Sequence, residues 1–179
     1  RDLFPEEYIN ALSYLHDSVD EFPFYQIKAL IEKEFQKPIN EIFNHFEETP
    51  IAAASIGQVH KARLLNTKLD VAVKIQRPNL STLFYEDLAV LRCIIGYLER
   101  HTELGKDREW TKIVDEIGKT LFEEIDFIQE GKNADLFREN LKYNEKIYIP
   151  KVFWQFTTRK IITIEYIPGI KITDLNSLE

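Results

Sequence analysis

The stretch V-A-V-K-I-Q, residues 71–76, decides the fold class. In an extended strand successive side chains point to opposite faces, so the three β-branched residues share one face and Lys74 shares the other with Ala72 and Gln76. Ala72 is small and leaves room beside the lysine for a flat ring or a phosphate chain. A solvent-facing strand lysine fits this stretch alone at least as well, so the surrounding sequence has to decide.

A run of small residues, A-A-A-S-I-G-Q-V at residues 52–59, precedes that strand. Small side chains let a backbone loop approach a ligand closely, and N–H groups exposed in such a loop can hold phosphates. Three alanines by themselves are more typical of a helix. A small-residue loop followed by a strand, a short turn and V-A-V-K is nevertheless the arrangement of a kinase nucleotide lobe. Residues 52–80 also carry five bases against one acid, which suits a polyphosphate.

A kinase-type lysine needs a carboxylate on the helix that follows it. The apolar pattern predicts one helix from Trp110 to about Leu141, and its apolar stripe contains Glu124. Asp126 and Glu130 lie on a different face of that helix, where a solvated role is an equally good interpretation. Because an unpaired charge inside an apolar stripe is costly, we expect Glu124 to pair with Lys74.

The remaining pattern indicates an α+β fold with a mainly antiparallel sheet. The last strand, I-I-T-I at residues 161–164, runs into E-Y-I-P-G, which fits either the hinge between two kinase lobes or an ordinary Pro-Gly turn. The other expected elements are helices over residues 3–16, 24–35, 39–42 and 83–98, a hairpin of strands over 56–65 and 69–76, and strands over 147–149 and 152–156.

Composition excludes several function classes. The net charge of -7 makes nucleic acid a poor partner, because affinity for it depends on clustered bases. No apolar run approaches the ~20 residues of a membrane span, and no signal-peptide pattern opens the chain. The single cysteine, Cys93, lies in an apolar helical pattern, so we expect a buried, inert thiol. The chain starts at Arg1 and contains no Met, and both ends are expected to be cuts through a longer protein.

These motifs together resemble the UbiB (ADCK/COQ-type) family of atypical kinases. The resemblance rests on A-A-A-S-I-G-Q-V, V-A-V-K-I-Q-R-P, E-I-D-F and E-Y-I-P-G, and it extends to the opening D-L-F-P-E-E-Y-I-N-A-L-S-Y-L-H-D, where His16 replaces the usual glutamine. It implies a protein-kinase-like N-lobe with inserted helices. The implied domains are a helical extension over residues 1–42, the nucleotide-binding lobe over 43–166, and the hinge with the start of an absent C-lobe over 167–179.

The resemblance also implies a site in which an alanine-rich loop replaces the glycine-rich one. Lys74 would be the nucleotide lysine and Glu124-x-Asp126 the E-x-D motif of the family, with Glu130 as the alternative salt-bridge acid. ATP or ADP would be the cofactor, and Mg²⁺ would be held by the missing C-lobe, with no metal ligand in this chain. The implied nucleotide-binding residues are Ala52, Ala53, Ala54, Ser55, Gly57, Gln58, Val59, Ala72, Lys74, Glu165 and Ile167.

The implied function is an atypical kinase or ATPase that supports prenylquinone or other isoprenoid-lipid metabolism. Such a protein would be intracellular and peripheral to a bacterial inner membrane, a mitochondrion or a plastid, with a lipid or prenylquinone-pathway proteins as partners. The K-x-G-Q motif and the catalytic and metal-binding aspartates of the family are absent, so this chain alone is expected to be inactive. A pseudokinase-like scaffold that binds nucleotide or lipid and a purely structural interaction module are the alternatives.

Overall fold

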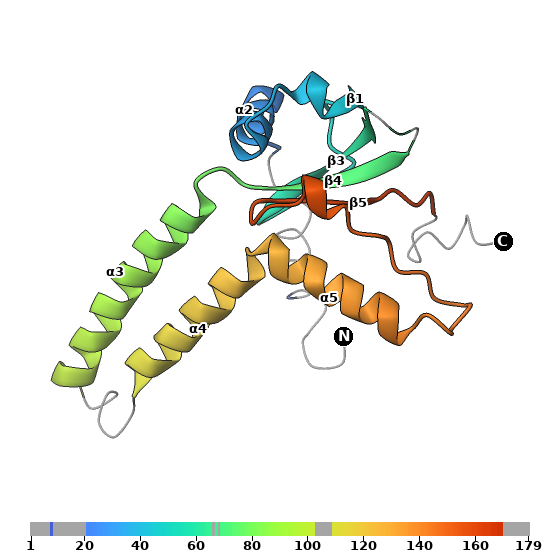
Figure 1. Cartoon of the computed structure of the whole chain (residues 1–179). Helices are drawn as coiled ribbons and strands as arrows, with labels where there is room; N and C mark the ends of the chain where they lie inside the picture. The colour runs from blue at the N-terminus through green and yellow to red at the C-terminus, as the bar shows by residue number, and fades with distance from the viewer. Residues whose placement is uncertain (1–7, 9–20, 66, 68, 103–108, 170–179) are drawn as a thin grey trace.

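The computed structural model describes residues 8, 21–65, 67, 69–102 and 109–169, which form an antiparallel five-stranded sheet with helices on both faces (Figure 1). The strands are β1 (Phe43–Phe46), β2 (Ala52–Ala54), β3 (Gly57–Leu64), β4 (Asp70–Gln76) and β5 (Ile161–Glu165), in the order β1-β3-β4-β5 with β2 paired to β3. The helices are α2 (Phe24–Phe35), α3 (Leu80–His101), α4 (Trp110–Glu124) and α5 (Phe127–Asn140), with short 3₁₀ helices at Ile39–Glu41 and Trp154–Phe156. The α+β class and the antiparallel sheet are confirmed.

The main core lies between α2 and one face of the sheet. Helix α2 contributes Ile27 and Ile31, which are fully buried, and β4 contributes Val71, Val73 and Ile75 from the alternating face predicted for it. Burying five aliphatic side chains of this size stabilises the fold by about 1.5–3 kcal/mol each relative to exposure. The described part of the predicted extension therefore packs on the sheet through one shared core. The boundary predicted at residue 42 stays a prediction.

The opposite face of the sheet is covered by α5. Phe127, at the start of this helix, is fully buried and clusters with Ile162 of β5 and with Val152. Gly131 lies one turn further on, and a Cβ atom there would come within 2.9 Å of the Trp154 ring. The absence of a side chain at this position lets the indole lie directly against the helix.

Helices α3 and α4 form a hairpin that projects away from the sheet (Figure 1). The two helices meet along a narrow seam, where Gly118 lies under Leu88 and the rings of Phe84 and Phe122 are 6.5 Å apart. Cys93 is exposed, so the prediction of a buried thiol was wrong. The apolar pattern of α3 is wider than the face that its contact with α4 covers.

Three further expectations need correction or lie outside the described residues. The helix predicted over residues 110–141 is two helices, because Asp126 caps a new one: its Oδ1 accepts a hydrogen bond from the Ile128 N–H at 3.0 Å. Residues 147–149 and 152–156 do not form strands; Val152 makes a single bridge to Ile164. The helix predicted over residues 3–16 lies outside the described part of the chain, apart from Tyr8.

In the described part of the chain, no helix is both long enough and apolar enough to span a membrane.

Candidate active site

Lys74 and Glu130 form a two-pronged ion pair at the centre of the candidate site. The Nζ atom of Lys74 lies 2.7 Å from Oε2 and 2.9 Å from Oε1 of Glu130, so it donates to both carboxylate oxygens. It also lies 4.7 Å from the centroid of the Phe127 ring, in cation–π range. The strand lysine is thus held by the first turn of α5 from two directions.

Two hydrogen bonds to backbone carbonyls place α5 so that this pair can form. Gln76, two residues after Lys74 on β4, is buried, and its Nε2 donates to the Ile125 carbonyl at 2.8 Å. The Phe127 N–H donates to the Arg159 carbonyl at 3.1 Å, which ties the same point to the segment before β5. Both bonds fall at the junction between α4 and α5, so the junction is fixed to the sheet independently of the ion pair.

The expectation that Glu124 pairs with Lys74 was wrong. Glu124 is exposed at the last position of α4, and the chain changes direction at Ile125 before α5 begins. A helical wheel drawn continuously through this junction misplaces every residue after it. Glu130 is the acid that α5 turns toward β4, which was the alternative that the family resemblance implied.

An open cavity of about 890 Å³ lies beside the Lys74–Glu130 pair. Glu124 and Asp126, the two acids of the E-x-D motif, both line it with Lys74 and Glu130. Asp126 is partly occupied by its capping bond, and its second oxygen lies 3.7 Å from Arg159 Nε. The structure therefore brings all four predicted catalytic residues to one cavity, although only one of the acids pairs with the lysine.

The alanine-rich stretch is a short strand rather than a loop. Ala52, Ala53 and Ala54 form β2 and pair with Val59, Gln58 and Gly57 of β3, which leaves Ser55 and Ile56 as the turn. Arg77 fixes this turn from the end of β4: its N–H donates to the Ile56 carbonyl at 2.8 Å and its Nε to the Ser55 carbonyl at 3.2 Å. The small-residue hairpin is thereby tied to the strand of Lys74.

Val59, Ala72 and Lys74 share one face of the sheet. Val59 lies directly opposite Lys74 in the β3–β4 register, and Ala72 is two residues from Lys74 on the same strand. These three predicted site residues are thus brought together as expected. Gly57 belongs to the same face, and a Cβ atom there would come within 2.3 Å of the Ile75 carbonyl oxygen, so only glycine fits.

Gln58 does not belong to this face, and its assignment to the nucleotide site is corrected. It is 1% exposed, its Oε1 accepts from the Phe22 N–H at 3.1 Å, and its Nε2 donates to the Phe22 carbonyl at 3.3 Å. The strand alternation points it away from Lys74, between Gly57 and Val59. Gln58 joins the segment before α2 to β3.

His60 continues this buried polar network, which the sequence analysis missed. Its ring nitrogens lie 2.9 Å from Gln58 Nε2 and 2.8 Å from the Glu47 carbonyl oxygen. Burial lowers the pKa of His60, and the bond to the Glu47 carbonyl offsets only part of that effect. The alternation of β3 could have identified His60 as buried, since it lies two residues from Gln58.

Glu165 and Ile167 lie at and beyond the end of β5. The Glu165 carboxylate accepts a hydrogen bond from the Tyr148 hydroxyl at 2.7 Å and lines a cavity that shares no residue with the one beside Lys74. Its side chain is thus engaged away from the ion pair. Ile167 is exposed, and its predicted role through backbone groups stays a prediction.

The cavity beside Lys74 is lined by this one base and by four acids, Glu123, Glu124, Asp126 and Glu130. Lys74 carries a point charge of the kind that binds phosphate, and it already donates to Glu130. Within the ranges that the structure describes, no group of three or more His, Cys, Asp or Glu side chains is arranged to hold a metal ion. The expectation that Mg²⁺ would depend on a second lobe stays a prediction.

The whole arrangement was compared with known proteins. Residues 14–179 match the family model described as the ABC1 atypical kinase-like domain. The chain is 41% identical to the protein ACTIVITY OF BC1 COMPLEX KINASE 8, chloroplastic, of Arabidopsis thaliana over 99% of this chain and 23% of the relative. It is 35% identical to the probable protein kinase UbiB of Marinobacter nauticus over 100% of this chain and 32% of the relative. The chain thus spans a quarter to a third of these relatives.

A solved structure shares the fold. The structure titled as the complex of Rv3197 and erythromycin from Mycobacterium tuberculosis matches with a TM-score of 0.74 and 27% identity, over 96% of this chain and 42% of the other. The predicted kinase-like fold is therefore confirmed by a protein of known structure.

Proposed function

Because the chain belongs to the ABC1 atypical kinase-like family, we propose that it is the nucleotide-binding lobe of an atypical kinase or ATPase. The observation that carries this proposal is the ion pair of Lys74 with Glu130 on the face that also holds Val59 and Ala72. A lysine held by a helix carboxylate beside an open cavity is the arrangement that positions nucleotide phosphates in kinases.

Each residue of this face has a separate part in the proposal. Lys74 would bind the phosphates as a point charge, and Glu130 would orient its ammonium group from α5. Val59 and Ala72 would pack against the base, and the β2–β3 turn fixed by Arg77 would cover the phosphates. The nucleotide supplies the transferable phosphoryl group, and the chain's own contribution is to bind and orient it.

The wider role proposed for the complete protein is support of prenylquinone or other isoprenoid-lipid metabolism at a membrane surface. The UbiB and chloroplastic relatives support this role, because their names and organisms indicate similar proteins in bacteria and plastids. Partners in that role would be a lipid or proteins of a prenylquinone pathway, with contact to the bilayer at its surface only.

Thermal unfolding of the full chain with ATP or ADP, each with and without Mg²⁺, tests nucleotide binding. A ligand that binds the folded state raises the melting temperature, by the equivalent of about 2.7 kcal/mol at a hundredfold excess over Kd. We expect the shift in the wild type and in Lys132→Ala, an exposed lysine on α5, and its loss in Lys74→Ala. An equal shift in Lys74→Ala would overturn the assignment.

A second candidate is a binding scaffold without phosphotransfer, favoured by the solved relative whose title names erythromycin as its ligand. The two candidates differ in turnover and not in binding. Release of phosphate from ATP by the complete protein, abolished by Lys74→Ala, would decide for the kinase or ATPase; nucleotide binding with no release would decide for the scaffold.

A further inference from the structure

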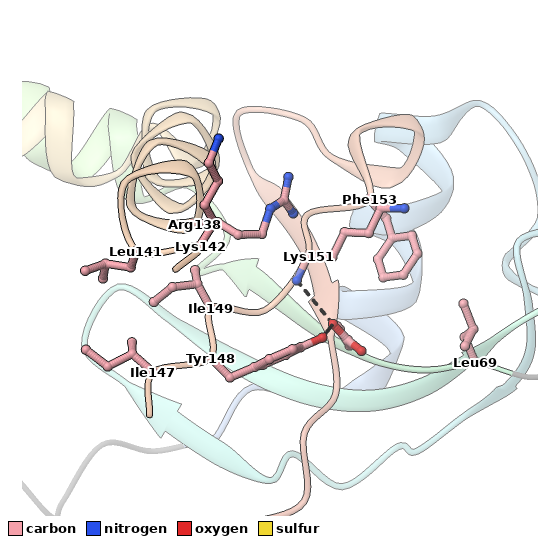
Figure 2. Close-up of a pocket in the computed structure, with 10 residues that line it drawn as sticks. Leu69, Arg138, Leu141, Lys142, Ile147, Tyr148, Ile149, Lys151 and Phe153 are labelled. Atoms are coloured by element: carbon pink, nitrogen blue, oxygen red, sulfur yellow. Dashed lines mark hydrogen bonds between the residues drawn. The ribbon is translucent and has the colours of Figure 1, made fainter. Parts of the chain in front are cut away.

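A second cavity, of about 480 Å³, lies where the last turn of α5, the segment 147–153 and the end of β5 meet (Figure 2). Its volume is within the range of small-molecule sites in proteins. None of its lining residues lines the cavity beside Lys74. It is therefore a separate site on the same lobe, and nothing in the proposed nucleotide chemistry uses it.

The walls of this second cavity are mainly aliphatic and aromatic. Leu141 directly follows α5, Ile147 and Ile149 come from the connecting segment, and Phe153 comes from the stretch after it. Ile147 is 45% exposed. An apolar ligand that covers this surface removes apolar area from water, which favours binding.

The polar groups of the cavity are predominantly basic. Arg138, Lys142 and Lys151 line it together with one acid, Glu165, in a chain whose net charge is -7. The Glu165 carboxylate is already engaged, because Oε2 accepts from the Tyr148 hydroxyl at 2.7 Å and lies 3.4 Å from the Lys151 N–H. That bond to a carboxylate raises the pKa of the Tyr148 hydroxyl, so this residue remains neutral.

Of the three bases, Lys151 has the least neutralisation of its charge by nearby carboxylates. Within α5, Arg138 Nη2 lies 3.0 Å from Asp135 Oδ1, and Lys142, just after the helix, pairs with Glu139. The ammonium group of Lys151 lies 5.9 Å from the centroid of the Phe153 ring, and no salt bridge joins it to a carboxylate in the described part of the chain. Arg138 reaches from α5 toward the segment that carries Lys151, and the Lys151 side chain extends from that segment toward the Phe153 ring, so both bases lie at the rim of the cavity (Figure 2).

We propose that this cavity binds a small anionic amphiphile, whose carboxylate or phosphate head binds at the basic rim that carries Lys151 and Arg138 and whose hydrocarbon body lies on Leu141, Ile147 and Ile149. A neutral hydrocarbon would leave the two bases unused, and a purely polar anion would leave the aliphatic wall in water. Charge-assisted hydrogen bonds to the head supply specificity, and burial of the tail supplies affinity.

The bound head would lie against the backbone that ends β5. The Glu165 N–H donates to the Lys151 carbonyl at 2.9 Å. Lys151, which would contact the anion, therefore also accepts the backbone hydrogen bond at the end of β5. A ligand held there is expected to slow amide hydrogen exchange over residues 147–153 and at Glu165. Protection confined to these residues identifies the site independently of affinity.

Isothermal titration of the full chain with dodecyl phosphate and with dodecanoate, each below its micelle concentration, tests the proposal. We expect at least one of the two anions to bind with a stoichiometry of one molecule per chain, and we expect neutral dodecanol to bind at least tenfold more weakly. Preference for the phosphate would indicate a lipid phosphate, and preference for the carboxylate a fatty acid. Binding of dodecanol as tight as that of the anions, or no binding of either anion, would overturn the proposal.

Matched lysine variants locate the binding. Lys151→Gln should lower the affinity for the anion by about tenfold, the amount expected for the loss of one charge-assisted hydrogen bond. Lys132→Gln removes the same charge from an exposed position outside the cavity and should have no effect. Lys74→Ala should also leave the anion affinity unchanged, which separates this site from nucleotide binding. Equal weakening by Lys151→Gln and Lys132→Gln would show unspecific charge attraction and contradict the proposal.

Discussion

Gln76 donates its side-chain N–H to the Ile125 carbonyl at 2.8 Å, and this single bond joins the strand of Lys74 to the junction between α4 and α5. The donor and the acceptor lie forty-nine residues apart, and the Gln76 side chain is 4% exposed. Together with the bond from the Phe127 N–H to the Arg159 carbonyl, the Gln76 bond fixes where α5 begins and therefore how far Glu130 lies from Lys74. The ion pair of the candidate site depends on a neutral amide that makes no contact with the cavity.

Replacement of Gln76 by leucine should lower the free energy of unfolding by about 1–3 kcal/mol, because the Ile125 carbonyl loses its buried partner. It should also weaken nucleotide binding, since α5 is no longer held in register with β4. Chemical denaturation and nucleotide titration of the same variant measure the two effects. Destabilisation with unchanged affinity would show that the bond stabilises the fold without positioning Glu130.

Glu130→Gln should lower nucleotide affinity by about tenfold, the equivalent of 1.4 kcal/mol, because the amide cannot hold the Lys74 ammonium as an ion pair does. Glu124→Gln is the matched control, since it removes an equal charge from the same cavity without touching Lys74. Titration of ATP and ADP against both variants tests the difference. A larger loss in Glu124→Gln would restore Glu124 as the acid that acts on the lysine.

Ala53→Gly should change the ratio of the affinities for ATP and ADP and raise adventitious phosphotransfer such as autophosphorylation in the complete protein. Ala53 is the middle residue of β2, opposite Gln58, and glycine there widens the backbone conformations that β2 can adopt. The cost to stability should be about 1 kcal/mol or less. Titration of both nucleotides at matched Mg²⁺ measures the ratio; equal ratios and unchanged autophosphorylation would make β2 a packing feature.

Gly57→Ala should destabilise the fold by about 1–3 kcal/mol, because its Cβ atom would overlap the Ile75 carbonyl, which is backbone and cannot rotate away. Gly96→Ala, in α3, should instead stabilise by up to about 1 kcal/mol. The Cβ atom at position 96 would meet only the end of the Arg100 side chain, at 3.9 Å. Thermal unfolding of the two variants should therefore move in opposite directions, and a shift of the same sign would contradict the packing described for β3 and β4.

Stability should fall as the pH is lowered below the ordinary histidine pKa of about 6.5, in part because of His60. Its pKa in the folded chain is lowered by burial, so between the two pKa values the unfolded state binds a proton that the folded state does not. The slope from this residue is at most about 1.4 kcal/mol per pH unit. Denaturation at about pH 7.5 and about pH 5.5 should show a smaller pH effect in His60→Gln than in the wild type or in His45→Gln, an exposed control.

The fold around Lys74 could be predicted because its signals are local. The β3–β4 hairpin follows from two alternating stretches, and α2 from one apolar stripe after Pro23. The partner of Lys74 could not be obtained from the same helical wheel, which assumed a single helix through Asp126. A signal was present: Asp126 followed three residues later by Gln129 is the pattern of a capping box, which marks a new helix start.

The exposure of Cys93 could not be predicted from its own helix. An apolar stripe on a helix predicts that another element packs on it, but how many of its residues are buried depends on how wide a face that element covers. Here α4 covers Leu88 and leaves Cys93 outside the seam. The strands expected at 147–149 and 152–156 failed for a related reason. Trp154 packs against Gly131 of α5, whereas Phe153 and Phe156 pack against the core between α2 and the sheet. Among the described residues of these two stretches, only Val152 makes a strand bridge.

Substitutions at the even-numbered and at the odd-numbered positions of strand β3 should affect different properties of the protein. Its even positions, Gln58, His60, Ala62 and Leu64, are at most 2% exposed and belong to the core or to the buried network beneath α2. Its odd positions begin with Gly57 and Val59 on the face of Lys74. In a saturation mutagenesis scan scored for both abundance and nucleotide affinity, neighbouring codons of one strand should therefore report on different properties: substitutions at Gln58 and His60 should lower abundance, whereas substitutions at Val59 should lower affinity in protein that still accumulates.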